Sequence, residues 1–473
     1  MKERIHQYFI EHRQEMLDDI MELVRIPSVN APAEEGAPFG PACRQVLDAA
    51  VAKAKSFGFR AEVLGDKVAV ADLNDCPAQL DILAHLDVVP AGDGWSVTEP
   101  FVPLMKDGRI YGRGTCDDKG PAIASLYAMR AVRELGIPLK HNARLILGAD
   151  EETGSQDIDY YYSHYPEAPC SFSPDADYPI INVEKGGFFT TYSSTWEGEP
   201  PLPRVFSLDS GTVGNAVPGK AEAVIEGLDP AEISPVAEKV AAQTGTEVTV
   251  TGTKERAVIT VVGTSAHAST PWEGCSSLTS LLTMLTLLPF APSEGMKRLQ
   301  GISKLFPHGD FYGNAAGIAQ EDEISGKLTL TMNVLHYKLN ELSGRVDCRA
   351  PVCANEKNAL EPLRRKMAER GLELSPDCHM MLPHHVPEDG PLVQTLLQCY
   401  EEVMHEPGKC IAIGGGTYAH FLKNGVAFGA AALGTDYHMH GPDEYLIIDE
   451  MVRSAELFAL AICRLCGEDA PRF

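Results

Sequence analysis

Acidic and imidazole side chains directly follow apolar segments at two places in the chain. QLDILAHLDVV offers His85 and Asp87, which project from the same face of an extended chain. An imidazole beside a carboxylate suits a metal ligand that a neighbouring acceptor orients. ARLILGADEETGS places Asp150, Glu151 and Glu152 at the end of an apolar run, where their repulsion favours a cation. The alternatives are a core histidine that binds a nearby acid and a solvated run of charges.

Three further segments add candidate ligands. GRGTCDDKGP offers Asp117 and Asp118 before an expected helix, where aspartates are also common as simple helix caps. SFSPDADYP offers Asp175, and TDYHMHGPDEY offers His438 and His440 before the last expected helix. Together these segments supply the mixed nitrogen and oxygen ligands that suit Zn²⁺, Co²⁺ or Mn²⁺. The ligands outnumber one tetrahedral site, so the sequence predicts two divalent metal ions.

The elements that must position these residues form an α/β pattern. Apolar strands are expected near 80–84 and 143–149, with an amphipathic helix at 121–135 between them. Such alternation predicts the α/β class, with a largely parallel sheet covered by helices on both faces. Ligands of open parallel sheets bind at the carboxyl ends of the strands, where these polar groups stand.

The pattern of expected strands and helices changes in the middle of the chain. From about residue 220, paired strands and helices indicate an α+β unit, and from about residue 389 the alternating α/β pattern resumes. There we expect a helix, a buried strand in CIAIGGG, another helix and a long final helix. We therefore expect a catalytic domain in two parts, 1–186 and 387–473, interrupted by a large lid domain over 187–386 with two subdomains.

Composition excludes several classes of protein. The 473 residues suggest two to four domains, and Lys+Arg 40 against Asp+Glu 66 gives a formal net charge of −26. This charge disfavours binding to nucleic acid or an anionic membrane. No apolar run approaches a transmembrane length, and the charged N-terminus shows no signal peptide. The 12 scattered cysteines then predict reduced thiols and a cytoplasmic location.

Familiar motifs of other chemistries are absent from the sequence. We find no G-x-S-x-G, H-E-x-x-H or G-x-x-x-x-G-K-[ST] pattern. Cys463 and Cys466 lie in an apolar helical pattern, where two packed small side chains are favoured over a metal or redox pair. The glycine run at 414–416 favours close backbone approach to a ligand over a nucleotide loop.

Six ordered motifs resemble those of the co-catalytic di-metal peptidases, the family of aminoacylases, glutamate carboxypeptidases, succinyl-diaminopimelate desuccinylases and carnosinases. The motifs are HLDVVPAGDGW, GRGTCDDKGP, DEETGS, PDADYP, GTSAHAS and HGPDE. VEKGG, GNAVP and IGGGTYAHFLKNGVAFGAA look most like the PepV-type dipeptidase branch. That pattern commonly has Arg after GGGTYA, where this chain has His420. This departure bears on substrate preference and not on hydrolysis.

The resemblance implies a role for each candidate ligand. Asp117 would bridge the two metals, because the family's bridging aspartate is the sixth residue of its GRG motif. The ligands that complete the two sites are then implied to be His85 with Asp175, and Glu152 with His440. His440 is preferred to His438 because the family's last histidine precedes x-x-[DN]-E, although both fit the chemistry. Zinc is the expected metal, with manganese or cobalt as alternatives.

The resemblance also implies the catalytic chemistry. Glu151 would be the general base for a metal-bridging hydroxide, and Asp87 would orient His85. His267, in GTSAHAS of the insert, would help to stabilise the oxyanion, although without the resemblance it reads as a surface histidine.

The substrate's own carboxylate needs a cation, and the resemblance places Arg349 in that position, with Arg345 as competitor. Asn215 and the glycines near Gly415 would hold the substrate backbone.

The expected function is that of a metal-dependent dipeptidase acting on dipeptides with a free C-terminal carboxylate. An N-acyl-amino-acid deacylase or desuccinylase of the same family is the alternative, and an inactive peptide-binding relative is the remaining one. Dimeric members of the family have a lid of about half this length and borrow a histidine from the partner. This insert carries its own His267 and Arg349, so we expect an active monomer.

Overall fold

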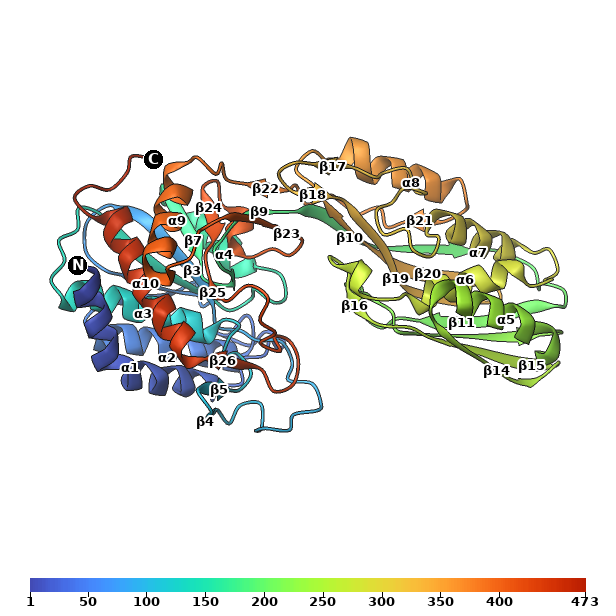
Figure 1. The fold of residues 1–473 in the computed structure, drawn as a ribbon, viewed down its shortest axis with the longest axis horizontal. Helices are drawn as coiled ribbons and strands as arrows, with labels where there is room; N and C mark the ends of the chain where they lie inside the picture. The colour runs from blue at the N-terminus through green and yellow to red at the C-terminus, as the bar shows by residue number, and fades with distance from the viewer. The chain divides into compact units, whose positions relative to one another are not determined.

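The chain divides into two compact units in the computed structural model, which describes all 473 residues (Figure 1). The first, which we call the split unit, is discontinuous and comprises Met1–Val183, His385–Ile411 and Gly416–Phe473. The second, the insert unit, comprises Glu184–His384 and Ala412–Gly415. The glycine run therefore divides between the units, whereas the sequence analysis assigned all of 387–473 to the discontinuous domain.

The split unit consists of a sheet, helices and several short strand pairs. Its helices are α1 (Lys2–Val24), α2 (Pro41–Ser56), α3 (Lys119–Glu134), α4 (Gln156–His164), α9 (Pro391–Met404) and α10 (Ile448–Cys466). Its main sheet contains β1 (Arg60–Leu64), β2 (Val68–Asp72), β3 (Ala78–His85), β6 (Asn142–Gly148), β7 (Cys170–Ser173), β9 (Ile180–Glu184) and β24 (Gly425–Ala427), with β22 (His384–His385) and β23 (Cys410–Ile413) pairing at the β9 edge. The short pairs are formed by β4 (Leu104–Lys106), β5 (Arg109–Tyr111), β26 (Tyr445–Ile447), β8 (Ala176–Asp177) and β25 (Ala430–Ala431).

Parallel pairing is confined to the centre of this sheet. The order β1-β2-β6-β3-β7-β24-β9 has parallel pairs between β6, β3, β7 and β24. The pairs β1–β2, β2–β6 and β24–β9 are antiparallel. The predicted α/β class is confirmed, and the structure adds antiparallel edges to the expected parallel centre.

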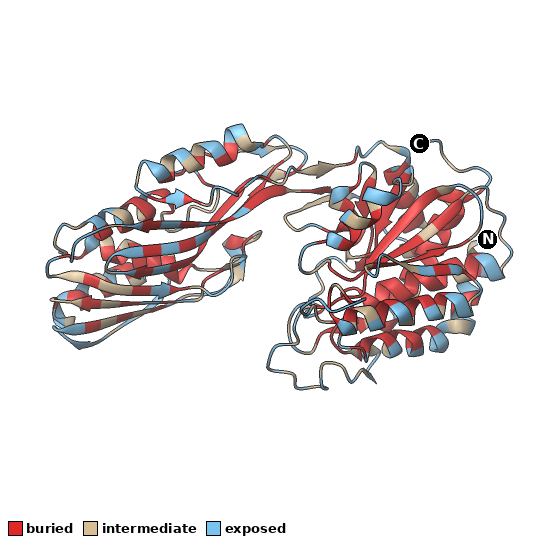
Figure 2. Ribbon diagram, turned by 180° about the vertical axis from the view of Figure 1, so that it is seen from behind, coloured by how far each residue is buried: buried red, intermediate tan, exposed pale blue.

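Helices cover both faces of the central strands. One face packs on α1, α2, α3, α9 and α10 through alternate residues such as Ile82 and Leu145. The opposite face packs on α4 and a 3-10 turn at Tyr418–Phe421 through Leu83 and Ile146. Seven of the eight residues of β3 are buried, as expected for a parallel strand covered on both sides (Figure 2).

The insert unit is built on one antiparallel sheet. Its strands, in spatial order, are β14 (Glu247–Thr253), β15 (Arg256–Val262), β13 (Lys220–Glu226), β11 (Arg204–Ser210), β19 (Thr329–Lys338), β20 (Glu341–Ala350), β10 (Gly186–Thr195) and β21 (Glu373–Leu374). Its helices are α5 (Pro230–Thr244), α6 (Ser277–Leu287), α7 (Glu294–Leu305) and α8 (Glu361–Ala368), and short pairs are formed by β12 (Ala216–Val217), β16 (Ala266–His267), β17 (Glu321–Asp322) and β18 (Gly326–Lys327).

Three details differ from the sequence predictions. The insert has one continuous sheet and one hydrophobic core instead of two subdomains, because the long strands β19 and β20 join its two halves. The helix expected after the glycine run is only the 3-10 turn at Tyr418–Phe421, and β23 is half-buried instead of buried. Cys463 and Cys466 pack as small buried side chains of α10, as favoured above.

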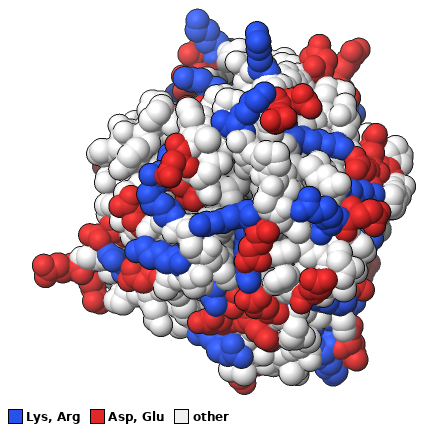
Figure 3. Space-filling model, turned by 90° about the vertical axis from the view of Figure 1, so that its left-hand side faces the viewer, with Lys and Arg blue, Asp and Glu red and all other residues white.

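The surface carries both signs of charge. Figure 3 shows basic and acidic side chains intermixed over one face of the molecule. None of the helices has the length and apolar character needed to cross a membrane.

Candidate metal centre

The parallel strands bring three of the candidate segments to one edge of the split unit's sheet. His85 is the last residue of β3, and β3 pairs in parallel with both β6 and β7. Glu151 and Glu152 follow β6 after a short connection, and Asp175 follows β7 in the same way. The carboxyl ends of three neighbouring strands therefore supply four of the predicted site residues.

Asp117 lies between the two histidines that were expected as ligands. Its Oδ1 is 2.9 Å from His85 Nε2, and its Oδ2 is 2.9 Å from His440 Nε2. The two oxygens of one carboxylate thus face two different imidazoles. This is the arrangement that a ligand shared by two cations requires.

The remaining predicted ligands lie on the two sides of Asp117. Asp175 Oδ2 is 3.5 Å from His85 Nε2, and Glu152 Oε1 is 3.1 Å from His440 Nε2. Two groups of ligand atoms each lie within 4.8 Å of one another: His85 with Asp117 and Glu152, and His85 with Asp118 and Asp175. The structure therefore brings together all five residues expected to bind metal.

The choice between the two histidines of TDYHMHGPDEY is clear in the geometry. His440 contacts two carboxylates of the cluster, although its side chain is 57% exposed. His438 Nε2 instead lies 4.0 Å from the carboxylate of Asp436, outside the cluster. The structure therefore favours His440.

Asp118 does not act as a helix cap. It stands at the N-cap position of α3, but its side chain makes no capping hydrogen bond there. Its Oδ2 accepts the backbone N–H of His85 at 3.1 Å, and its buried Oδ1 has no hydrogen-bond partner. Asp118 therefore fixes the backbone of a ligand and leaves one oxygen within reach of the same cluster.

Asp87 connects two of the strand ends. Its Oδ1 lies 3.4 Å from His85 Nδ1, and its two oxygens accept the backbone N–H groups of Glu151 and Glu152 at 3.2 and 3.1 Å. The imidazole Nδ1 also lies 3.0 Å from the Asp87 carbonyl oxygen. Asp87 thus holds both the His85 ring and the loop that carries the acidic pair.

The electrostatics of the cluster follow from burial and crowding of like charges. Burial, together with the carboxylates of Glu152 and Asp117, raises the pKa of Glu151 to about 8. Burial and neighbouring carboxylates likewise raise the pKa of Asp175 well above its usual range.

Hydrogen bonds act in the other direction at Asp117. Burial disfavours the charged form of Asp117, but hydrogen bonds from His440 and His85 hold its pKa well below the usual range. Hydrogen bonds to Asp117 and Glu152 raise the pKa of His440 to about 10. The Asp117 carboxylate is therefore kept ionised.

These residues fit a pair of divalent cations. Six carboxyl groups gather around two imidazoles, so full ionisation of the cluster would need more positive charge than the histidines supply: Asp87, Asp117, Asp118, Glu151, Glu152 and Asp175. The donor set consists of nitrogen and oxygen ligands without a thiolate, as suits Zn²⁺, Mn²⁺ or Co²⁺. The unpartnered Asp118 oxygen adds a further acceptor.

The predicted substrate residues all belong to the insert unit. His267 is exposed in β16, and its Nδ1 lies 2.7 Å from the Ser269 hydroxyl. Asn215 is exposed, and its carbonyl accepts the N–H of Ala268 at 2.9 Å. Gly415 belongs to the same unit and is half-buried.

Arg349 is already engaged within the insert unit. Its Nε and Nη2 donate to the two oxygens of Asp347 at 2.8 and 3.0 Å, and its Nη1 donates to the carbonyl of Gly414. Its guanidinium also lies 4.3 Å from the centre of the Phe189 ring. Arg345 is exposed and has no carboxylate partner, which strengthens its standing as competitor for a substrate carboxylate.

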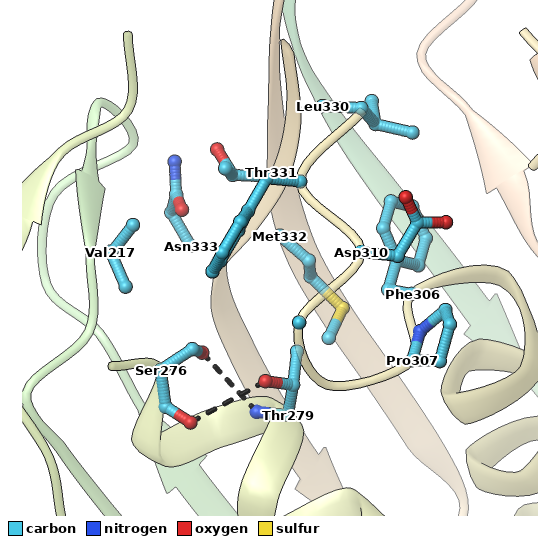
Figure 4. A pocket seen from close by; sticks show the side chains of 12 residues that line it. Val217, Ser276, Thr279, Phe306, Pro307, Asp310, Leu330, Thr331, Met332 and Asn333 are labelled. Carbon is cyan, nitrogen blue, oxygen red and sulfur yellow. Dashed lines mark hydrogen bonds between the residues drawn. The ribbon is translucent and has the colours of Figure 1, made fainter. Parts of the chain in front are cut away.

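Two cavities of the insert unit differ greatly in size. A cavity of about 470 Å³ is lined by Asn215, Arg345 and Arg349. The pocket in Figure 4 encloses only about 20 Å³, and the Ser276 hydroxyl at its edge accepts the N–H of Thr279. A volume of that size holds a water molecule, whereas the larger cavity has the dimensions of a small-ligand site.

A buried hydrogen-bond relay behind the acidic loop was not predicted from the sequence. The Tyr418 hydroxyl donates to Asp157 Oδ2 at 2.6 Å, and the same oxygen accepts the N–H groups of Ala149 and Asp150. The relay fixes the backbone just before Glu151. The available signal was the tyrosine after the glycine run, in a segment that was interpreted only through its glycines, its motif match and His420.

Comparison with known proteins agrees with this geometry. Residues 82–464 match the family model described as Peptidase family M20/M25/M40. The chain belongs to this peptidase family, which is the di-metal family that the sequence motifs resemble.

Two curated relatives match over nearly the whole chain. One is the "Putative dipeptidase YtjP" of Bacillus subtilis (strain 168), 34% identical over 462 residues that cover 96% of this chain and 98% of the relative. The other is the "Beta-Ala-Xaa dipeptidase" of Lactobacillus delbrueckii subsp. lactis, 32% identical over 461 residues that cover 96% of each.

Solved structures share the fold at low sequence identity. Human carnosine dipeptidase 1 aligns with a TM-score of 0.59 and 17% identity, covering 97% of this chain and 98% of that one. The Saccharomyces cerevisiae di-peptidase Dug1p aligns with a TM-score of 0.59 and 12% identity, covering 98% of each chain. These similarities confirm the expected fold.

Proposed function

We propose that this peptidase is a metal-dependent dipeptidase that hydrolyses the amide bond of dipeptides with a free C-terminal carboxylate. The observation that carries the proposal is the position of Asp117, whose two oxygens each lie 2.9 Å from a different histidine. The dipeptidase names of two relatives at 34% and 32% identity support the choice of substrate class.

Five residues would hold the cations. Asp117 would be shared, and the other ligands on its two sides are His85, Asp175, Glu152 and His440. Bound divalent ions would lower the pKa of a water molecule and polarise the scissile carbonyl. We expect zinc, with manganese or cobalt as alternatives for the same donor set.

Glu151 is the residue we propose for proton transfer. Its carboxyl group lies among the expected ligands, next to Glu152 in the chain, where a general base could accept a proton from water and return it to the leaving amine. Asp87 accepts the backbone N–H of Glu151, so the position of this carboxylate is tied to the ligand strand that ends at His85.

Recognition of the substrate is assigned to the insert unit. We propose that Arg349 or Arg345 binds the carboxylate, that Asn215 and the backbone near Gly415 hold the peptide, and that His267 donates to the oxyanion. The two arginines and Asn215 line one cavity of about 470 Å³, which supports a shared role.

A monomer in the cytoplasm is the proposed active form. The insert carries its own His267 and Arg349, and all 12 cysteines are free thiols, as is typical of a reducing compartment. Sedimentation of the active enzyme should therefore give one chain per particle, and an obligate dimer would contradict this part of the proposal.

A substrate panel tests the main assignment. The metal-stripped enzyme should be inactive, and readdition of Zn²⁺, Mn²⁺ or Co²⁺ should restore cleavage of dipeptides. Tripeptides, amidated dipeptides and N-acyl amino acids are the comparison substrates. Preference for an N-acyl amino acid over a free dipeptide would replace the dipeptidase proposal with the deacylase alternative.

A further inference from the structure

Glu444 is a completely buried carboxylate behind the proposed metal ligands. Its Oε1 accepts backbone N–H groups from Gly114 and Cys116 at 3.0 Å and from Asp117 at 3.3 Å. Its Oε2 accepts a hydrogen bond from Arg113 Nη1 at 2.6 Å. One carboxylate thus gathers the backbone of the loop that presents Asp117.

Arg113 extends this contact to the loop that carries His440. Its Nη2 donates to the carbonyl of Gly441 at 3.0 Å, directly after His440, and more weakly to the carbonyl of Ala91 at 3.4 Å. Its guanidinium lies 5.5 Å from the centre of the Trp95 ring, and its side chain is almost fully buried. The arginine therefore joins three separate loops of the split unit.

The backbone next to Arg113 and Glu444 continues the pairing of two strands. β26 and β5 are antiparallel neighbours, with Tyr445 opposite Tyr111. The N–H of Gly112 then donates to the Glu444 carbonyl at 2.9 Å, just beyond the last strand pair. The two loops are thus in register before the side chains of Arg113 and Glu444 cross-link them.

We propose that Arg113 and Glu444 form a positioning clamp that sets the separation of Asp117 and His440 for cation binding. Neither side chain is a ligand in this scheme. A buried ion pair is a costly way to stabilise a fold, because desolvation offsets much of its attraction. The contacts of this ion pair with the loops of Asp117 and His440 therefore indicate a positioning role in addition to any effect on stability. The inference rests on the proposed metal-dependent function.

The chemistry of the clamp makes Glu444→Gln a sharp test. In either orientation, the amide NH₂ of glutamine would face donors, either the three backbone N–H groups or the arginine. We expect the affinity for Zn²⁺ or Mn²⁺, measured by titration calorimetry on the metal-free protein, to fall by roughly 10–100-fold. Amide hydrogen exchange in 112–118 should become at least about tenfold faster.

Asp72→Asn provides a matched control in the same unit. Asp72 is also a buried carboxylate paired with an arginine, with Oδ1 2.8 Å from Arg144 Nε, but it contacts neither ligand loop. This variant should lower the melting temperature without changing cation affinity or exchange in 112–118. Arg113→Lys is a second test, because it keeps the charge and loses the planar fork that joins Glu444 to Gly441. Its cation affinity should lie between those of the native protein and Glu444→Gln.

The outcomes separate the two proposals. A native protein that binds neither cation would defeat the proposed function itself. Native binding combined with unchanged affinity and unchanged exchange in Glu444→Gln and Arg113→Lys would overturn the clamp. An affinity loss no greater than that of Asp72→Asn would also overturn it, because general destabilisation would then explain the effect.

Discussion

The two groups of predicted functional residues occupy different kinds of environment. In the split unit, the expected metal ligands contact one another, and Asp87 and Asp118 hold their backbone. In the insert unit, Arg349 is paired with Asp347, and Asn215 and His267 are exposed. The fold alone brings the expected cation ligands into contact, whereas the two arginines and Asn215 proposed to recognise a substrate share a cavity without contacting one another in this way.

The largest expected effect tests the residues of the split unit that the fold brings into contact. Glu151→Gln should reduce kcat by roughly 10²–10⁴-fold, because the variant cannot transfer a proton, and should leave cation binding intact. Turnover and metal content of the same sample provide the measurement. Turnover near the native rate would remove Glu151 as the base.

A smaller effect should separate the neighbouring histidines. His440→Ala removes a proposed ligand that contacts Asp117 and Glu152, so we expect cation affinity to fall by at least roughly 10–100-fold, the loss typical for groups that only orient metal ligands. His438→Ala is the control in the same loop and should bind cations as the native protein does. Equal losses in the two variants would show that the loop, and not the ligand, is what the substitution affects.

The insert unit offers a test of the two arginines. Loss of a charge-assisted contact to the substrate carboxylate should raise KM by roughly 10–100-fold with little change in kcat. Because Arg349 is held by Asp347, we expect Arg345→Ala to change KM at least as much as Arg349→Ala. Amidated dipeptides are the control, since neither substitution should affect them. If the native enzyme cleaves free and amidated dipeptides equally, neither arginine binds the substrate carboxylate.

The smallest effect on turnover is expected for a buried acid remote from the cluster. Burial raises the pKa of Asp81 from its ordinary value of 3.8 to about 6. Between those values the folded protein keeps a proton that the unfolded chain releases, so folding stability falls as pH rises. Other buried acids also titrate in this window, so the prediction is a difference between two proteins. Native protein should lose on the order of 2–3 kcal/mol more than Asp81→Asn does. Urea unfolding at pH 4 to 7 measures the difference.

Asp72→Asn gives the opposite sign as a control. Burial disfavours ionised Asp72, but hydrogen bonds from Arg144 and Arg60 outweigh it and lower its pKa. Its stabilising contribution is therefore present above about pH 4 and is lost as pH falls. Parallel pH profiles for the native protein and Asp81→Asn would contradict the account of Asp81.

The sequence was informative where chemistry follows strand ends. The strand that ends at His85 and the strand before Glu151 were predicted close to their observed bounds, and parallel pairing necessarily brings such ends together. The motif match favoured His440, the histidine that contacts Asp117 and Glu152, whereas spacing alone could not choose, because both histidines lie in one irregular loop. Its ring position depends on contacts with Asp117 and Glu152 from distant parts of the chain.

Other features depend on tertiary contacts that periodicity does not record. Asp347 and Arg349 lie two residues apart on one strand and form an ion pair. The sequence alone is equally consistent with two unpaired charges at these positions. The single sheet of the insert arises because β19 and β20 form nine residue pairs along their length, which the local sequence pattern does not reveal. Likewise, the proposed role of Glu444 depends on its contact with Arg113, which lies 331 residues away in the sequence.

The most direct measurement is the metal stoichiometry of the native protein and of Asp117→Asn, determined by titration calorimetry and elemental analysis. Native protein should bind two divalent ions per chain, and Asp117→Asn should lose the paired site together with hydrolysis of dipeptides. Two ions bound with unchanged affinity in Asp117→Asn would contradict the claim that one carboxylate joins the two cation sites.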